Sequence, residues 1–458
     1  MKDYDVIIIG AGASGVFMAY ELAKLDKGIK VCMIDRGDPI EKRVCPIDGK
    51  KIKSCIHCKT CAIMNGFGGA GGMSDGKYNI TNSFGGDLFA HTGRSEAIEL
   101  MEYVDKVNIE MGGADAKLYS TVSTDLKAEA LRYDLHLLDA KVRHLGTDRN
   151  RTILQNIYDR IKDKIDIHFR EEVQSVEKNG DRFTVTTDKD TYGCGQVAAA
   201  AGRSGSKWMS ALCESFGIHT RSNRVDIGVR VELPAAVFEH ITSKVYESKI
   251  VFRTKKYGDL VRTFCMNPYG EVVNENTNGI ITVNGHSYAD PALHTENTNF
   301  ALLVSNTFSE PFKDSNLYGE SIARLSNMLG GGVLVQRFGD LVAGRRTNEH
   351  RLSQSFTVPT LKATPGDLSL VIPKRQLDDI IEMIYALDKI APGTANYDTL
   401  LYGVEVKFYN SKVSVDDNLE TSVKGLYALG DGSGVTHSLS QASASGVYAA
   451  RIIAGQYN

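Results

Sequence analysis

The pattern of apolar and polar positions along the chain predicts an α/β fold. Residues 4–9 (YDVIII) form a short, β-branched apolar run that is typical of a buried strand. Residues 16–27 then place alanine and leucine at helical spacing, and residues 30–34 (KVCMI) predict a second strand. Residues 225–233 (VDIGVRVEL) and 279–285 (GIITVNG) have the composition of strands. The chain therefore alternates strands and helices near its start and is rich in strands in its middle.

The turn between the first strand and the first helix has the sequence GAGASG. Gly10 allows a tight turn, Gly12 lets the backbone approach a pyrophosphate, and Gly15 lets the helix pack closely on the strand. The helix, with Gly28 as its expected C-cap, offers N–H groups and a partial positive charge to phosphates. Asp35, twenty positions after Gly15, can accept hydrogen bonds from both ribose hydroxyls. A glycine turn without a nucleotide is the alternative, but the order of strand, glycines, helix, strand and acid predicts a dinucleotide site.

The far end of the chain distinguishes FAD from NAD. Residues 424–429 (KGLYAL) predict a strand that leads into GDGSG (430–434) and a helix over 439–454. An acid at a strand end can bind a polyol chain, and a helix N-terminus can face an electron-rich ring edge. FAD has a ribityl chain and such a ring edge, whereas NAD has neither. Residues 196–201 lead into a third glycine turn, GRSG (202–205), and the three turns together predict FAD.

These elements are separated along the chain, so we predict a discontinuous FAD-binding domain of the Rossmann type. Residues 151–205 predict a helix, a strand, a hairpin around Asn179-Gly180 and a further strand. No second G-x-G-x-x-G motif follows a strand, so NAD(P)H is expected at most as a transient electron donor. The predicted domains are 1–205 with 396–458, which binds FAD and carries a cysteine-rich insertion at 45–61, and 206–395, an inserted mixed β-sheet and helical substrate domain.

Several motifs resemble known flavoproteins. GAGASG with Asp35-Arg36-Gly37, AAAGRSG and GLYALGDGSG are similar to the FAD domain of glutathione-reductase-type flavoproteins. Six further blocks resemble the bacterial FAD-dependent (NAD(FAD)-utilising) dehydrogenase family. These blocks are 66–79 (GFGGAGGMSDGKYN), 144–148 (HLGTD), 262–273 (RTFCMNPYGEVV), 298–304 (TNFALLV), 336–346 (QRFGDLVAGRR) and 400–409 (LLYGVEVKFY). The resemblance spans nearly the whole chain, and it implies the cofactor more than the reaction.

The resemblance implies that the glycine loop 66–76 lies along the flavin ring and the pyrophosphate. Small residues would also let backbone N–H groups reach ring atom N5 and the phosphates, although a flexible surface loop is the alternative. Val173, after the strand predicted at 165–170, is implied to contact adenine. The predicted FAD-binding residues are Gly10, Gly12, Ala13, Ser14, Gly15, Asp35, Arg36, Gly68, Gly69, Gly71, Gly72, Ser74, Asp75, Val173, Ala201, Gly202, Gly430, Asp431, Gln441 and Ala442.

Four of the eight cysteines, Cys45, Cys55, Cys58 and Cys61, fall within 17 positions. Three thiolates spaced in this way can converge on one centre with Cys45 as a fourth ligand, which suits a [4Fe–4S] cluster or tetrahedral Zn²⁺. Neighbouring lysines would also favour a redox dithiol beside the flavin. Ordinary free thiols are the fourth interpretation, and the sequence leaves all four open.

Candidate catalytic residues lie in or near the family-like blocks. The number of basic side chains among them indicates an anionic substrate, because guanidinium groups bind carboxylates in a bidentate manner. For each residue, an ion pair or a satisfied interior polar group is the alternative role. The candidates for proton transfer or substrate binding are His144, Arg345, Arg346, Tyr402 and His437, with Arg262 and Lys407 as further anchors.

Composition and charge narrow the class of function. The chain has 458 residues, of which 42% are hydrophobic and 24% charged, and this balance excludes a disordered protein. A net charge of −3 argues against a nucleic-acid binder. No apolar run approaches the roughly 18 residues of a membrane span, and the first residues lack the pattern of a secretory signal. We therefore expect a cytoplasmic protein without nucleic-acid or membrane partners.

The predicted function is that of an FAD-dependent oxidoreductase. It would transfer a hydride between flavin N5 and a small, anionic organic substrate. The alternative is an electron-transfer flavoprotein, in which a cysteine-bound cluster passes electrons between FAD and a redox partner protein.

Overall fold

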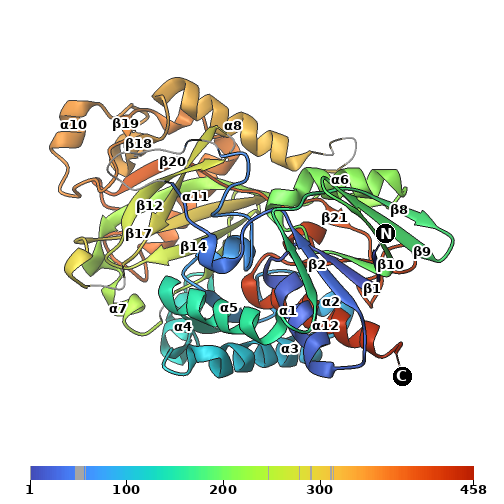
Figure 1. Cartoon of the computed structure of the whole chain (residues 1–458). Helices are drawn as coiled ribbons and strands as arrows, with labels where there is room; N and C mark the ends of the chain where they lie inside the picture. The colour runs from blue at the N-terminus through green and yellow to red at the C-terminus, as the bar shows by residue number, and fades with distance from the viewer. Residues whose placement is uncertain are drawn as a thin grey trace. The chain divides into compact units, whose positions relative to one another are not determined.

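The computed structural model describes residues 2–46, 56, 58–245, 247–277, 279–288, 291–309, 312 and 314–457. The chain divides into two compact units, and each has its own apolar core. Unit 1 comprises Met1–Tyr119, Ala140–Asn223 and Tyr409–Asn458, and unit 2 comprises Ser120–Asp139 and Arg224–Phe408. Figure 1 shows both units and labels many of their helices and strands.

Unit 1 contains a seven-stranded mixed sheet. Its strands are β1 (Lys2–Ile9), β2 (Val31–Asp35), β7 (Asp166–Phe169), β8 (Val173–Asn179), β9 (Arg182–Thr187), β10 (Thr191–Ala199) and β22 (Leu426–Ala428). Their order is β7-β2-β1-β10-β9-β8, and β22 also pairs with β10. Strands β7, β2, β1, β10 and β22 run parallel to one another. Strand β9 runs antiparallel to both of its neighbours, the first half of β10 and β8. The hairpin predicted around Asn179-Gly180 is confirmed.

Apolar side chains of β1 are buried on both faces of this sheet. Val6 and Ile8 belong to the same core as residues of α1 (Ala13–Leu25) and α12 (Leu439–Ala454). Ile7 and Ile9 belong to a second cluster, which includes residues of α6 (Ser206–Ser215). Burial on both faces explains why this strand is a continuous apolar run rather than an alternating one.

The three helices that the sequence predicts in unit 1 are present, with differences at some of their ends. Helix α12 has the predicted bounds, whereas α1 ends earlier than expected: its C-cap is Asp26, with φ 49°, and not Gly28. Aspartate is one of the few residues that adopt this left-handed conformation readily. The other elements are α2 (Phe89–Thr92), α3 (Arg94–Asn108), α5 (Thr147–Ile161), β3 (Lys77–Ile80), β4 (Leu118–Ser120), β6 (Lys141–His144), β11 (Thr220–Arg221) and β21 (Lys412–Val413).

Unit 2 contains an eight-stranded sheet in the order β19-β18-β20-β12-β17-β14-β13-β5. These strands are β5 (Leu135–Leu137), β12 (Val225–Pro234), β13 (Ile250–Arg253), β14 (Leu260–Asn267), β17 (Asn297–Asn306), β18 (Leu334–Arg337), β19 (Thr364–Pro365) and β20 (Leu400–Lys407). A separate hairpin pairs β15 (Glu271–Thr277) with β16 (Ile280–His286). The helices are α4 (Thr124–Leu131), α7 (Glu239–Thr242), α8 (Ser315–Gly330), α9 (Phe338–Val342), α10 (Glu349–Ser353) and α11 (Lys374–Leu387). None of the helices in the described ranges is long and apolar enough to cross a membrane.

The two faces of the unit 2 sheet differ in polarity. In β12, Ile227, Val229 and Val231 lie in the apolar core that also holds residues of α11. The alternate positions Asp226, Arg230 and Glu232 are polar, yet each is 0% exposed. Alternation in the sequence predicts the strand, but it does not predict that both faces are buried.

The division into units differs from the predicted domain boundaries. The break expected after residue 205 lies after Asn223, and the break expected before residue 396 lies after Phe408. Residues 120–139 belong to unit 2, where β5 pairs with β13. A strand of three residues whose partner lies far along the chain has no local sequence signal. The roles assigned to the two domains remain predictions.

Candidate functional site

The first glycine turn joins β1 to α1 at the carboxyl edge of the parallel strands. Gly10 has φ 105°, and a Cβ on it would lie 2.4 Å from the oxygen of Ala200. A Cβ on Gly15 would lie 2.0 Å from the oxygen of Gly10. The tight turn and the close helix packing predicted for these two glycines are therefore confirmed.

Gly12 differs from its neighbours because it faces open space. Apart from its chain neighbours and its own helix backbone, no atom of the described residues lies within 4 Å of the Cβ that would be added there. Gly12 is also the N-cap of α1, and no side chain caps this helix. The N-terminus of α1 is thus built to receive a ligand group such as a phosphate.

Asp35 ends β2, and its carboxylate joins three segments of backbone. Oδ2 accepts a hydrogen bond from the N–H of Ala11 at 2.8 Å. Oδ1 accepts from the N–H groups of Gly37 at 2.7 Å and Gly66 at 2.9 Å. A carboxylate has about four acceptor positions, so about one stays available, which is enough for one ribose hydroxyl rather than the two that were predicted. The sequence predicted the acid but not this organising role.

The glycine loop 66–76 lies directly against the first turn. The N–H of Gly68 donates to the oxygen of Ala11 at 2.7 Å. A Cβ on Gly69 would lie 2.8 Å from Cα of Gly12, and one on Gly71 would lie 2.5 Å from Cδ2 of Leu439. Side chains are thus excluded at several points of the loop, which explains its glycines and argues against a loose surface loop.

The end of this loop turns back on itself. The hydroxyl of Ser74 donates to the oxygen of Gly71 at 2.7 Å and accepts from the N–H of Gly76 at 3.3 Å. The oxygen of Asp75 accepts from the N–H of Gly146 at 2.8 Å. These contacts give Ser74 and Asp75 a role in shaping the loop, and their predicted contact with FAD remains a prediction.

Arg43, which no motif marks in the sequence, lies fully buried beneath the loop. Its guanidinium donates at 2.7–3.0 Å to four backbone carbonyls, those of Ala62, Ile63, Phe67 and Gly69. A trans peptide directs its N–H away from its C=O, so the bond to Gly69 turns the N–H of Ala70 away from Arg43. Burial lowers the pKa of Arg43 to about 10, which leaves it charged at neutral pH. Arg43 therefore sets the orientation of the loop's peptide groups.

The last glycine turn meets the first turn at Ser14. A Cβ on Gly430 would lie 2.4 Å from Oγ of Ser14. Farther along, a Cβ on Gly446 would lie 2.0 Å from the oxygen of Ser14, so this glycine lets α12 cross α1 closely. Ala442 lies buried in the same helix.

The third turn joins the same group. A Cβ on Gly432 would lie 3.0 Å from the nitrogen of Gly202, and Nε of Arg203 lies 3.8 Å from Oδ2 of Asp431. The N–H of Gly205 donates to the oxygen of Ala201 at 3.1 Å. The structure thus brings together all the glycine segments that the sequence singled out, although they lie far apart along the chain.

Two predicted FAD ligands have partners within the protein. The amide of Gln441 donates to the oxygens of Thr81 and Phe84 at 3.3 and 3.2 Å and accepts from the N–H of Leu88 at 3.3 Å. Its side chain therefore holds residues 81–88, and the predicted contact of Gln441 with FAD remains a prediction.

Arg36 is occupied in a similar way. It donates to Oδ1 of Asn65 at 2.9 Å, to Oε1 of Glu172 at 3.2 Å and to the oxygen of Ser204 at 3.1 Å.

Val173 begins β8 and pairs with Thr187. Its predicted adenine contact through the backbone remains a prediction.

The candidate catalytic residues do not form one cluster within either unit. His144 and His437 belong to unit 1, whereas Arg345, Arg346 and Tyr402 belong to unit 2. The ring of His437 packs edge-on against Tyr409 at 4.6 Å. His144 ends β6, opposite Lys77 of β3.

Tyr402 and Arg345 have structural partners. Tyr402 is 0% exposed, and its hydroxyl donates to Oε2 of Glu232 at 2.5 Å. Burial and the Glu232 carboxylate raise the pKa of Tyr402 well above its usual range, so it keeps its proton. Arg345 binds Oδ1 of Asp340 at 2.8 Å and the hydroxyl of Tyr397. These placements favour structural roles over the predicted catalytic ones.

The structure describes three of the four cysteines of the predicted metal site. Cys45 and Cys61 are half-buried and Cys58 is exposed, while Cys55 lies outside the described residues. Within the described ranges, no group of histidine, cysteine or acidic side chains is arranged to hold a metal ion. The four-cysteine metal site therefore remains a prediction.

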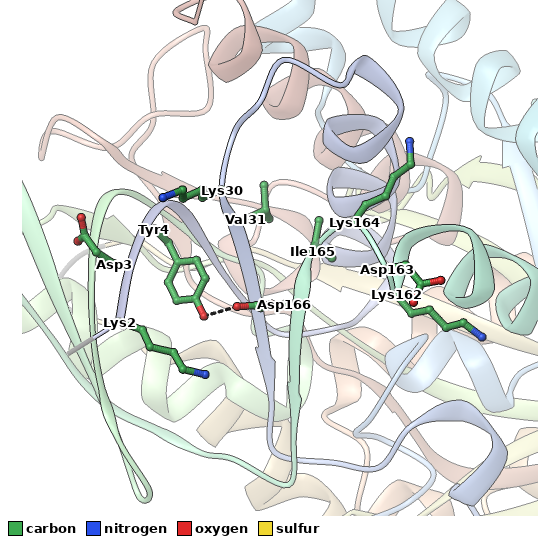
Figure 2. Close-up of a pocket in the computed structure, with 10 residues that line it drawn as sticks. All are labelled: Lys2, Asp3, Tyr4, Lys30, Val31, Lys162, Asp163, Lys164, Ile165 and Asp166. Atoms are coloured by element: carbon green, nitrogen blue, oxygen red, sulfur yellow. Dashed lines mark hydrogen bonds between the residues drawn. The ribbon is translucent and has the colours of Figure 1, made fainter.

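A hollow of about 440 Å³ lies at the opposite edge of the unit 1 sheet (Figure 2). It is lined by the first residues of β1, β2 and β7, among them Lys2, Tyr4 and Asp166. The hydroxyl of Tyr4 donates to Oδ2 of Asp166 at 2.6 Å across it. The glycine turns follow the other ends of these strands, so this hollow is separate from the candidate FAD site.

Comparison with protein families agrees with this geometry. Residues 224–408 match the family "FAD-dependent protein, C-terminal domain-like", and residues 5–42 match "FAD dependent oxidoreductase". The first match coincides with the longer segment of unit 2, and the second covers the first glycine turn and Asp35. The chain is an FAD-dependent oxidoreductase with an α/β fold.

Solved structures give more distant likenesses. Glycine oxidase from Geobacillus kaustophilus is 11% identical, with a TM-score of 0.41, and the match covers 99% of this chain and 95% of that one. L-proline dehydrogenase from P. horikoshii is 14% identical, with a TM-score of 0.42 and coverages of 100% and 95%. L-alpha-glycerophosphate oxidase from Mycoplasma pneumoniae, with FAD bound, is 12% identical, with a TM-score of 0.40 and coverages of 99% and 95%. No curated protein matches the chain in sequence.

Proposed function

We propose that unit 1 holds FAD in the glutathione-reductase-type manner. The pyrophosphate would lie at Gly12 and the N-terminus of α1, and the ribose would bind the remaining acceptor position of Asp35. The flavin would lie along loop 66–76, with the ribityl chain near Asp431. The residues fit the cofactor, because Gly12 leaves space free of side chains beside an uncapped helix N-terminus.

The proposed reaction is hydride transfer to or from a small organic substrate. When bound, FAD supplies the atom that accepts or releases the hydride. The chain contributes orientation: Arg43 fixes the peptide groups of loop 66–76, and Asp35 fixes the first turn against that loop. Unit 2 is the proposed substrate domain, and its buried polar sheet face supports this role.

The open space at Gly12 carries the proposal, and it allows a sharp test. Because a Cβ at position 12 would meet no atom of the described residues beyond its own stretch of chain, we expect Gly12→Val to leave the melting temperature of the flavin-free protein unchanged. The valine would occupy the proposed pyrophosphate position, so we expect FAD affinity to fall at least 100-fold in a fluorescence titration. Gly455→Ala, at a position with ordinary φ and only ordinary contacts, is the matched control. Unchanged FAD binding in Gly12→Val would refute the proposed mode.

The alternative function as an electron-transfer flavoprotein is supported by the grouping of four cysteines within one short segment. Iron analysis and EPR of anaerobically purified, dithionite-reduced protein distinguish the two. A cluster signal favours electron transfer to a partner protein. Its absence, together with flavin reduction by NADH or NADPH in stopped-flow experiments, favours the dehydrogenase.

A further inference from the structure

Two asparagines of unit 1 lie where the chain passes between the units. The chain leaves unit 1 after Asn223 and returns to it at Tyr409, next to Asn410. Strands β11 and β21 pair in antiparallel register beside these points, with Arg221 opposite Lys412. Continued by two residues, this register places Asn223 opposite Asn410. The pair Asn223 and Asn410 is named the asparagine clasp below.

The side-chain amide of Asn410 joins the glycine turns at 202–205 and 430–434. Its Nδ2 donates to the oxygen of Asp431 at 2.8 Å and to the oxygen of Gly202 at 3.3 Å. The oxygen of Asp431 also accepts from the N–H of Gly434 at 3.2 Å. Asn410 is buried, and a side-chain amide nitrogen carries two N–H donors, so these two bonds use both of them.

Asn223 holds the backbone of Asn410 against the same turn. Its Nδ2 donates to the backbone oxygen of Asn410 at 3.0 Å and to that of Gly434 at 3.2 Å. Gly434 has φ 70°, and a Cβ on it would lie 2.7 Å from the same oxygen of Asn410. The last glycine turn is thus held closely to the clasp at both Asp431 and Gly434.

The bonds from Asn410 fix the direction of two peptide groups. A trans peptide directs its N–H away from its C=O, so the bonds to Asp431 and Gly202 turn the next N–H groups away from Asn410. These N–H groups belong to Gly432 and Arg203. The side chain of Asp431 is 25% exposed, so a ligand can reach its carboxylate. The clasp therefore sets the peptide plane that directly follows this carboxylate.

We propose that Asn410 is a positioning residue for FAD, which orients the turn that carries Asp431 toward the ribityl chain. This inference rests on the proposed function, in which the ribityl chain lies near Asp431. Asn410 acts through Asp431 rather than by touching the cofactor, and Asn223 holds Asn410 in place. Its effect belongs to the flavin half of FAD, because the pyrophosphate is proposed to lie at Gly12.

The test compares FAD with ADP, which has the same adenosine and two phosphates but neither ribityl chain nor flavin. Both are titrated calorimetrically into the flavin-free full chain, as wild type and as Asn410→Ala. We expect Asn410→Ala to weaken FAD binding at least 10-fold and to change ADP affinity less than twofold. At saturating FAD, the visible circular dichroism of the bound flavin should also change. Equal loss for both ligands, unchanged FAD affinity, or a wild type that binds ADP as tightly as FAD would overturn the assignment.

Asn327→Ala is the matched control. Nδ2 of Asn327 also donates to two backbone carbonyls, those of Ile281 at 2.7 Å and Gly332 at 3.2 Å, but in unit 2. This variant should bind FAD and ADP as the wild type does. A loss of FAD affinity in Asn327→Ala as large as that in Asn410→Ala contradicts the assignment.

Asn223→Ala is the milder second variant. It leaves both bonds from the side chain of Asn410 in place, so we expect FAD binding to weaken about 3-fold and ADP binding to stay unchanged. If Asn410→Ala does not fold, Asn223→Ala decides the question by the same comparison of FAD with ADP. Unchanged FAD affinity in that variant would then overturn the assignment.

Gly12→Val separates this inference from the proposed function. It places a side chain at the proposed pyrophosphate position, so it should weaken FAD and ADP binding alike. If the wild type binds neither ligand, the proposed function and this inference fail together. If Gly12→Val weakens both ligands and Asn410→Ala weakens neither, only this inference fails.

Discussion

At the scale of single residues, Arg43 is the side chain on which the candidate FAD site depends most. Its planar guanidinium reaches four carbonyls at once, which a lysine ammonium with three donors cannot do. In Arg43→Lys, at least one buried carbonyl would lose its partner, at a cost of about 1–3 kcal/mol. We therefore expect a lower melting temperature and about 10-fold weaker FAD binding, measured by flavin fluorescence.

Arg143→Lys is the control for the loss of a buried arginine. Arg143 is also buried in unit 1, but its partners are Asp105 and the oxygen of Ala116 rather than loop 66–76. This variant should lose stability and keep its FAD affinity. If both variants bind FAD as the wild type does, Arg43 has no role in positioning the loop.

At the scale of elements, helix α11 carries a carboxyl group with an unusual pKa. Asp379 is fully buried, and burial together with the neighbouring Asp259 raises its pKa from 3.8 to about 6. Asp259 is held in its charged form by Arg375, whose guanidinium donates to it at 2.6 and 2.8 Å. The folded protein thus keeps a proton on Asp379 that the unfolded chain releases at lower pH.

The sign of this effect can be tested with Asp379→Asn. Between about pH 4 and 6 the native state binds more protons than the unfolded state, so Asp379 lowers the free energy of unfolding as pH rises. Asparagine cannot ionise and removes this slope. The variant should gain stability relative to wild type, on the order of 2 kcal/mol, between pH 4 and 7 in urea unfolding. A stability difference that does not change with pH would contradict the raised pKa.

Elements with local signals could be predicted from the sequence, and those without could not. The strand–glycine–helix unit at 2–25 and the helix over 439–454 have clear patterns, and the structure contains both. Strand β5 and the buried roles of Arg43 and Gln441 depend on partners far along the chain. Such contacts are set by packing rather than by local propensity, so no motif indicates them.

At the scale of the whole molecule, each unit has its own apolar core. We propose that FAD binds unit 1 alone. Calorimetry of the flavin-free protein should therefore show two unfolding transitions. FAD at about 1,000 times its Kd should stabilise unit 1 by about 4 kcal/mol and raise only the transition of that unit. Gly12→Val should abolish this shift, whereas Asp379→Asn, which lies in unit 2, should raise the other transition at pH 7. The contrary outcome is a single unfolding transition that both FAD and Asp379→Asn raise. In that case the two units unfold together, and FAD stabilises unit 2 as well as unit 1.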